Sequence, residues 1–417
     1  MKIDVRSEIG ELEGVILHTP GPELENMNPK NAERALYSDI LNLAVARKEY
    51  AQFAGLLEAV TRTYQVRDLL ESVLSQPSAR ESLLRRICAA EGWMDLYDDL
   101  LAMPPKTLTR QLIEGVILPR DNLTRFLSKE RFSLPPLHNF FFTRDAAMAL
   151  RDEILIGRMA KPIRARESII MEAIFNHSPL FGVNTVNPTG VENPDACASI
   201  EGGDVLIARE DVLVVGNGSR TSSQGIDFII ERIKAQKDPL RHLLIQELPL
   251  SPESFIHLDM VFTFLDRSHC MVFEPLMLNS NKYQTIHVIV DNGRVISIHE
   301  EKGLIDALRG LGMELTAVCC GGRTDPWVQE REQWHSGANF FALAPGKIVG
   351  YARNIHTAEE LSNSGFEIIP ADDIITGRRR LSELKRCAIT LDGSELPRGG
   401  GGARCMTLPI RRRPVVW

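Results

Sequence analysis

A single cysteine near the end of the chain follows an unusual run of glycines. The segment reads Arg398-Gly399-Gly400-Gly401-Gly402-Ala403-Arg404-Cys405-Met406. Glycine lets a backbone approach a ligand closely or adopt a positive φ, and a neighbouring arginine favours the thiolate, which is the nucleophilic form of cysteine. Residues 406–410 have the pattern of a buried strand, which is not typical of a disordered tail. The segment therefore indicates a nucleophilic thiol delivered by a glycine loop.

Four other segments place charged or amide side chains at expected strand ends, beside glycine or aromatic residues. They are Asn139–Asp145, Glu201–Asp204, Gly216–Arg220 and His257–Phe262. We expect His257 and Asp259 on one face of a strand, because strand side chains alternate between faces. Taken singly, these residues also have ordinary structural explanations: Asp145 as a helix cap, Asp204 as a turn residue and His257 as a core histidine.

In combination, the same residues indicate chemistry on a planar cation. A thiolate attacks an electrophilic carbon, and several carboxylates bind a guanidinium through paired hydrogen bonds. A guanidinium becomes a good electrophile when its charge is held and its leaving nitrogen can be protonated. The residues that supply these functions are Cys405, His257, Glu201, Asp145 and Asp259. We expect no metal site, because the sequence has no H-E-x-x-H, no EF-hand loop and no clustered Cys/His spacing.

Composition and charge limit the class of protein. The chain has 417 residues, of which 44% are hydrophobic and 25% charged, as in globular proteins. A net charge of −7 and a pI near 5.9 argue against a nucleic-acid or anionic-membrane surface. The first residues are polar, no apolar run approaches a membrane span, and seven cysteines lack C-x-x-C spacing, so we expect a cytoplasmic protein. The cysteines expected to be buried small hydrophobes are Cys88, Cys197, Cys270, Cys319, Cys320 and Cys387.

Two patterns of hydrophobicity alternate along the chain. Residues 71–127 have the spacing of amphipathic helices, with Ser78 as an expected cap facing Glu81 and a second helix over 107–114. Elsewhere strand, strand, helix and strand recur in that order. Strands are expected at 15–17, 152–156, 205–208, 212–215, 271–273 and 287–290, and helices at 222–235 and 302–311. The simplest architecture is one α/β domain over 1–417 with a helical insertion at 71–127.

The order and content of these motifs resemble the bacterial arginine deiminases, within the guanidine-modifying superfamily. Six motifs carry the resemblance: 12–21 (LEGVILHTPG), 142–145 (FTRD), 201–204 (EGGD), 257–259 (HLD), 331–334 (REQW) and 404–406 (RCM). The resemblance implies a five-bladed pseudosymmetric α/β propeller with the active site on its axis. It also implies that the insertion at 71–127 is the extra helical module of these enzymes.

The resemblance further implies a role for each site residue. Cys405 is the expected nucleophile, His257 and Glu201 the proton-transfer pair, and Asp145 and Asp259 the guanidinium ligands. The residues expected to hold the α-carboxylate of the substrate are Asn139, Arg164 and Arg220, with Arg166 as a nearby alternative to Arg164. The implied reaction converts L-arginine to L-citrulline and ammonia through a cysteine thiouronium, with no cofactor or metal. We also expect a homo-oligomer that binds a small guanidino substrate and no nucleic acid or membrane.

Two positions depart from the pattern of the family. Arginine deiminases usually have an arginine five residues before the nucleophile, where this chain has Gly400, and a proline where it has Ala146. The first departure puts affinity for free arginine and closure of the loop in doubt. Two alternatives therefore stay open: a deiminase or amidinotransferase for another guanidino compound, and a non-catalytic arginine-binding protein.

Overall fold

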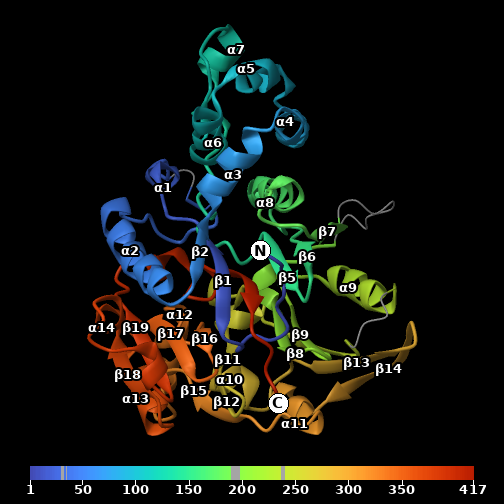
Figure 1. Ribbon diagram of the computed structural model, residues 1–417, viewed down its shortest axis with the longest axis vertical. Helices are drawn as coiled ribbons and strands as arrows, with labels where there is room; N and C mark the ends of the chain where they lie inside the picture. Colours follow the sequence, from blue (N-terminus) through green and yellow to red (C-terminus); the bar gives the residue numbers. More distant parts are fainter. Residues whose placement is uncertain (30–31, 34, 189–197, 236–239) are drawn as a thin grey trace.

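Five sheets of three or more strands in the computed structural model share one pattern of strand pairing (Figure 1). The structure describes residues 1–29, 32, 33, 35–188, 198–235 and 240–417. In four of these sheets two antiparallel strands come first, a helical connection follows, and a later strand pairs parallel with the second. The fifth sheet has the same pairings, but its first antiparallel strand comes from the C-terminal end of the chain. This confirms the strand, strand, helix, strand order expected from the sequence.

The first two of these units occupy the middle of the chain. One consists of β5 (Ala147–Leu150), β6 (Glu153–Ile156), α8 (Ala165–His177) and β7 (Asn184–Val186). The other consists of β8 (Val205–Arg209), β9 (Val212–Asn217), α9 (Ser223–Ala235) and β10 (His242–Glu247). Its sheet is extended by an antiparallel hairpin of β13 (Thr285–Asp291) and β14 (Arg294–Glu301). β8 and β9 are almost continuously buried, which explains their unbroken apolar sequences.

The next two units follow toward the C-terminus. One contains β11 (Phe262–Phe264), β12 (His269–Val272), α10 (Glu274–Met277), α11 (Leu304–Gly310) and β15 (Thr316–Cys319). After α12 (Pro326–Trp334), the other contains β16 (Phe341–Ala344), β17 (Lys347–Tyr351), α13 (Ile355–Asn363), β18 (Glu367–Pro370), α14 (Ala371–Ile375) and β19 (Cys387–Leu391).

The two ends of the chain build the fifth sheet together. β20 (Leu408–Arg412) pairs antiparallel with β1 (Leu12–Leu17), and β1 pairs parallel with β2 (Arg62–Gln65) after α1 (Pro22–Glu25) and α2 (Leu43–Val60). The buried strand expected after Met406 is therefore present, two residues later than its pattern suggested. The last strand places the cysteine segment against the start of the chain.

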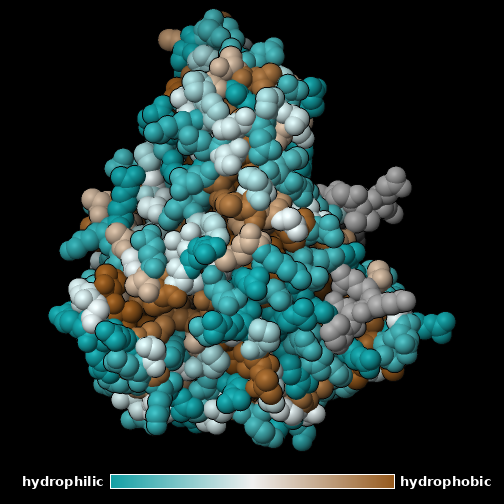
Figure 2. Space-filling model, viewed as in Figure 1, coloured by the Kyte–Doolittle hydropathy of each residue, from teal (hydrophilic) through white to brown (hydrophobic). Residues whose placement is uncertain are grey.

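A helical segment projects from the sheets at the top of Figure 1. It contains α3 (Val66–Leu74), α4 (Pro77–Glu91), α5 (Tyr97–Ala102), α6 (Pro105–Glu114), α7 (Leu123–Leu127) and the short pair β3 (Val116–Ile117) and β4 (Phe132–Leu134). Buried residues of α3, α4 and α6 belong to the same hydrophobic cluster as those of α8 and β5. On the face shown in Figure 2, hydrophobic residues gather where the projection meets the sheets.

The structure corrects two details of the helical segment. Helix begins at Val66, earlier than the expected residue 71. Ser78 is not the cap of α4: the helix starts at Pro77, and Gln76 occupies the cap position without a side-chain hydrogen bond. Proline is well suited to the first helical position, because the N–H that it lacks would have no partner there. The expected stop at Gly115 is confirmed, with a φ of 96°.

The burial of the described cysteines also follows the sequence. Cys88, Cys270, Cys319, Cys320 and Cys387 are buried free thiols, while Cys197 lies outside the described residues. Within the described ranges, none of the helices combines the length and the apolar character that crossing a membrane requires.

Candidate active site

The site residues lie in loops that lead into the first strands of the five units. Asp145 precedes β5, Glu201 precedes β8, His257 and Asp259 precede β11, and Cys405 precedes β20. A cavity with about 740 Å³ of empty space, part of it open to solvent, is lined by Asn139, Asp145, Arg164, Arg220, His257 and Cys405. Glu201 and Asp259 lie behind this wall, in contact with His257 and Cys405. The structure thus brings all eight sequence-predicted residues to one site.

Cys405 is buried, and its thiol faces two carboxylates. Its Sγ lies 3.7 and 3.9 Å from the two carboxylate oxygens of Asp259. Burial, followed by the negative charges of Asp259 and Asp145, raises the pKa of the thiol well above its usual value. The charge of Arg404 acts in the opposite direction, as expected from the sequence, but it is a smaller influence. In the unliganded site the thiol is therefore held protonated.

Asn339 is a site residue that the sequence analysis missed. Its Nδ2 donates to Cys405 Sγ at 3.1 Å and to the Asp259 carbonyl at 3.1 Å, while its Oδ1 accepts from the Arg404 and Cys405 amides at 2.9 and 3.3 Å. Asn339 lies just before β16, the position that the other site residues occupy in their own units. That shared position is the signal that could have found it.

We expect Asn339→Ala to lower kcat for the reaction of this site by about tenfold or more, with little change in KM. A hydrogen bond to a charged group contributes about 1.5–3 kcal/mol, and Asn339 donates one to the sulfur that must become a thiolate. The matched control is Asn354→Ala, which removes a buried amide that donates to the His335 carbonyl. Steady-state kinetics decide between them: equal losses in both variants would assign Asn339 a purely structural role.

Two glycines before Cys405 are required by close contacts. A Cβ at Gly402 would lie 2.6 Å from Asn339 Oδ1, and one at Gly401 would lie 2.5 Å from the Phe142 ring. The Gly401 carbonyl also accepts a hydrogen bond of 3.1 Å from the Tyr351 hydroxyl. The glycine run therefore lets the backbone pass close to the side chains that surround Cys405.

The side chain of Arg404 points away from the cavity and hydrogen-bonds to buried groups in the interior. Its guanidinium donates to both Glu8 oxygens at 2.9 and 3.1 Å, to Asp259 Oδ2 at 2.8 Å and to the Val205 carbonyl at 2.8 Å. The side chain is 1% exposed. Its main contribution is to hold the carboxylate of Asp259 next to Cys405.

Asp145 has one occupied and one open carboxylate oxygen. Its Oδ2 accepts a 2.7 Å hydrogen bond from Arg164 Nη1. Its Oδ1 is buried with no hydrogen-bond donor in reach among the described residues, and lies 3.8 Å from His257 Nδ1. An anionic oxygen left without a donor in a buried cavity is costly, so it favours a cationic ligand.

The two residues expected to transfer protons lie in hydrogen-bonding contact. His257 Nε2 lies 3.0 Å from Glu201 Oε2. Burial alone would lower the pKa of His257, but the charge of Asp145 and the hydrogen bond to Glu201 raise it to about 9. Burial alone would raise the pKa of the Glu201 carboxyl, but the hydrogen bond from His257 and the charge of Arg220 lower it to about 2. The pair is therefore an imidazolium beside a carboxylate near neutral pH.

The strand expected to carry His257 and Asp259 is not formed. Leu258–Met260 is a short 3-10 helix, and β11 begins only at Phe262. Asp204, itself the end of another 3-10 turn, accepts the Leu258 amide at 2.8 Å. This contact fixes the turn, so both site residues face Cys405 and its cavity without strand alternation.

The three residues expected to hold a substrate carboxylate differ in how many of their polar atoms already have partners in the protein. Asn139 donates to the Ala35 carbonyl at 2.8 Å. Arg220 lies 3.7 Å from Glu201 Oε1, and its Nη1 has no hydrogen-bond partner in the described part of the chain. Arg164 is held by Asp145 and by Glu167, whose carboxylate accepts from its Nε and Nη2 at 2.8–3.1 Å. Arg220 is thus the more available cation, and the roles of Asn139, Arg164 and Arg220 all stay predictions.

The glycine loop enters the site from an anchored turn. Glu49 of α2 accepts the amides of Ser394, Glu395 and Leu396 at 2.7–3.1 Å. Arg398 pairs with Glu395 at 2.9 Å and with Asp39 at 3.1 Å. Gly400 lines the cavity with a φ of 83° and has open space around its missing side chain. The loop is therefore held at both ends while position 400 faces free volume.

Comparison with known proteins gives consistent likenesses. A sequence model of the family described as arginine deiminase matches residues 33–412. The arginine deiminase of Listeria innocua is 30% identical over 427 residues, and that of Bacillus cereus 32% over 435 residues, each alignment covering at least 98% of both chains.

Solved structures show a shared α/β fold at low sequence identity. An amidinotransferase of saxitoxin biosynthesis from Microseira wollei superposes with a TM-score of 0.55 at 13% identity, covering 100% of this chain and 98% of that one. The N-terminal domain of ArgZ, a cyanobacterial arginine dihydrolase, superposes with a TM-score of 0.52 at 13% identity, covering 97% and 99%. A dimethylarginine dimethylaminohydrolase gives 0.51 at 13%, covering 95% and 99%.

Proposed function

Because this chain belongs to the arginine deiminase family, we propose that its cavity hydrolyses L-arginine to L-citrulline and ammonia. The observation that carries the proposal is the open Oδ1 of Asp145, a buried anionic oxygen beside the thiol and the imidazolium. A guanidinium cation satisfies that oxygen and can also reach the carboxylate of Asp259 behind Cys405. The same arrangement holds the electrophilic carbon near the sulfur.

Binding of the substrate prepares the nucleophile. The charges of Asp145 and Asp259 hold the thiol protonated in the empty site. A bound guanidinium places a positive charge between these carboxylates, which lowers the pKa of the thiol, and the thiol proton is released to solvent. The amide of Asn339 donates to the sulfur and stabilises the thiolate that results.

The chemical steps use one thiolate and one imidazole. Cys405 Sγ forms a bond to the guanidinium carbon while His257 gives its proton to the leaving nitrogen, so the C–N bond breaks and ammonia departs. The product is a thiouronium on Cys405 and a neutral His257. Water then gives one proton to His257 as its oxygen attacks the same carbon. When the C–S bond breaks, the second proton of that oxygen passes to the released ammonia, which becomes ammonium, and neutral citrulline and the thiolate result. Glu201 holds the imidazole throughout.

The pH dependence of kcat should report the proton on His257, because the thiol has already lost its proton in the substrate complex. Its pKa is raised to about 9 in the folded protein, so the acid form predominates below that pH and is lost as pH rises through it. We expect kcat for arginine to fall above about pH 9. Rates measured over pH 6–10 check this, and a profile still rising at pH 10 would exclude a protonated His257 as the acid.

Gly400→Arg should lower KM for arginine and leave kcat largely unchanged. A guanidinium at this position can contact the polar end of a bound substrate, because nothing fills the space around Gly400. A non-glycine residue at positive φ costs about 1–2 kcal/mol. Gly377→Arg is the matched control, since Gly377 has a φ of 74°, equally open surroundings and no place in the cavity. An unchanged KM for every substrate would show that position 400 does not govern recognition.

The activity itself is tested with a panel of guanidino compounds. Purified protein is incubated with each compound, and ammonia and citrulline are measured, with Cys405→Ala as the blank. Release of both from arginine without an added amine supports the proposal and excludes an amidinotransferase. Turnover of another compound instead of arginine would favour the alternative raised by Gly400. Thermal stabilisation by arginine without ammonia would indicate a binding protein.

We further propose that the five units are the blades of a five-bladed α/β propeller, with residues 1–417 forming one catalytic domain. Each unit contributes a residue to the site from the loop before its first strand: Asp145, Glu201, His257, Asn339 and Cys405. Five loops of equivalent position meet at one point most simply when the units surround an axis. The helical segment is an insertion in this domain, because it shares a hydrophobic cluster with the neighbouring unit.

The setting in the cell is also a proposal. The described cysteines are all free thiols, which fits the reducing cytoplasm. The net charge of −7 disfavours nucleic acid as a partner. Leu123, Phe126 and Leu127 on α7 are 67–72% exposed, and their apolar surface supports association into a homo-oligomer. Light scattering on the purified chain measures that state directly.

A further inference from the structure

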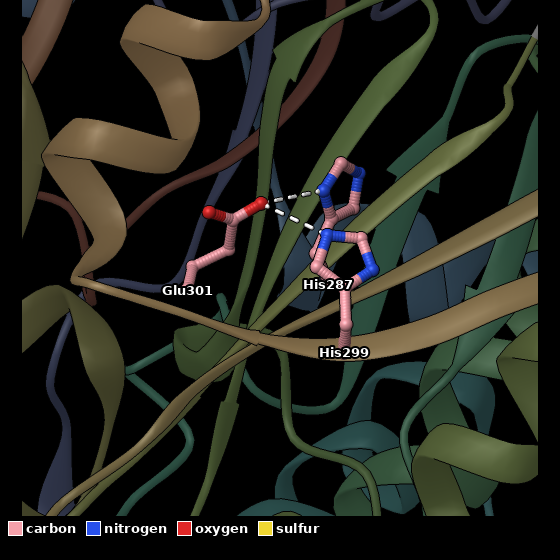
Figure 3. A group of neighbouring side chains, drawn as sticks. All are labelled: His287, His299 and Glu301. Carbon is pink, nitrogen blue, oxygen red and sulfur yellow. Dashed lines mark hydrogen bonds and ion pairs between the residues drawn. The ribbon is translucent and has the colours of Figure 1, made fainter.

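Two histidines and a glutamate converge on the outer hairpin of the five-stranded sheet (Figure 3). His287 on β13 lies directly opposite His299 on β14, and Glu301 follows His299 by two residues. Because strand side chains alternate, all three project from the same face of the sheet. None of them lines the cavity that contains Cys405.

The donor atoms of these side chains have the spacing of a metal site. Glu301 Oε1 lies 3.1 Å from His287 Nδ1 and 3.2 Å from His299 Nε2, and all three atoms lie within 4.8 Å of one another. Tetrahedral zinc with bonds of about 2.0–2.2 Å requires ligand atoms roughly 3.3–3.5 Å apart. Small side-chain rotations therefore suffice to place one ion between the three atoms.

A third histidine orients the most buried ligand. His242 Nδ1 lies 3.0 Å from His287 Nε2, on the side of the ring opposite Glu301. When His287 donates this hydrogen bond, its Nδ1 carries a lone pair directed at the cluster. Metal-binding histidines almost always have such a partner on the second ring nitrogen, which fixes the tautomer and the ring orientation.

The charge and exposure of the cluster also suit a cation. In the part of the chain that the structure describes, no lysine or arginine forms an ion pair with Glu301, whose charged-group contacts are the two imidazoles. The side chain of His287 is 6% exposed, that of Glu301 27% and that of His299 46%. The site is thus anchored in the sheet on one side and open to water on the other, which leaves room for a solvent ligand.

We propose that His287, His299 and Glu301 bind one divalent cation of the class that prefers imidazole ligands, such as Zn²⁺. Two imidazoles and one carboxylate select zinc and its neighbours over Mg²⁺ and Ca²⁺, which prefer oxygen ligands. The bound ion links β13 to β14 across the hairpin. The site is separate from deimination, so it neither requires nor supplies chemistry at Cys405.

The test is a zinc titration of the full-length, tag-free protein after treatment with a chelator. Calorimetry should show one binding event that weakens by roughly tenfold or more in both His299→Ala and Glu301→Gln. His299 is half exposed, so its replacement should not disturb folding. The matched control is His356→Ala, which removes an exposed histidine 3.3 Å from Glu359 and should leave the binding unchanged. Arginine turnover without added metal should be the same in all three variants.

Two results would overturn the proposal. One is the absence of zinc binding by the wild-type chain. The other is an isotherm that is unchanged in His299→Ala and Glu301→Gln, which would place the ion elsewhere, for example at Asp145, Glu201 and His257 or at a thiol. Anomalous scattering from a zinc-soaked crystal gives an independent measurement, with the peak expected between β13 and β14.

Discussion

Replacing Cys405 with alanine is expected to reduce turnover of arginine by at least about 1,000-fold, because removal of a covalent nucleophile leaves only binding and electrostatic stabilisation. Substrate should still bind, since Asp145 and Asp259 remain in place and the thiol contributes little to holding a cation. The measurements are single-turnover kinetics and calorimetric titration with arginine.

The wild-type enzyme supplies the complementary observation. Acid quenching during turnover should trap an amidino adduct on the peptide that contains Cys405 and on no other cysteine peptide. Cys320→Ala is the matched control, because Cys320 is equally buried but lies outside the cavity. Residual turnover in Cys405→Ala above a tenth of wild type would remove this residue from the mechanism.

Replacing Arg404 with methionine is expected to destabilise the fold by about 3–5 kcal/mol. The change leaves the buried carboxylates of Glu8 and Asp259 without their shared cation, and breaking a buried pair from one side is strongly destabilising. The free energy of unfolding from urea denaturation measures the effect.

An exposed arginine on the last strand provides the comparison. Arg411 pairs with Glu13 at 2.8 Å, with the two side chains 38% and 30% exposed. Arg411→Met should cost less than about 1 kcal/mol, because water screens such pairs. If both replacements cost the same, the interior network around Arg404 does not stabilise the protein as its contacts indicate.

Local sequence patterns were sufficient for most of the secondary structure. The apolar runs at 205–208 and 212–215 became β8 and β9, and the helix expected over 222–235 became α9 with nearly the same limits. Burial on both faces explains why these strands could be predicted from continuous apolar segments. Ser78 shows the limit of such patterns, since Pro77 set the start of α4 instead.

The site residues were found from their chemistry, but their contacts were not. Arg404 was expected to act on the thiol, whereas its guanidinium reaches Glu8 from almost the opposite end of the chain. Asn339 lies in no charged motif, and its role depends on amides at positions 404 and 405 that only the folded chain brings near. Contacts between residues this far apart in the sequence depend on how the five units pack together. The spacing of nearby residues does not predict that packing.

Because β1 pairs with β20, the active site is expected to be completed late in folding. The proposed nucleophile, Cys405, lies just before β20, and β20 reaches its place only by docking on a strand that was synthesised hundreds of residues earlier. Contacts of such long sequence separation carry a large loop-closure entropy and form slowly. In a chain whose separate sheets have formed but whose β1 and β20 have not yet paired, Asp145, Glu201 and His257 are in place but Cys405 is not beside them. The thiol of Cys405 can therefore react with substrate only after the N-terminal and C-terminal strands have paired.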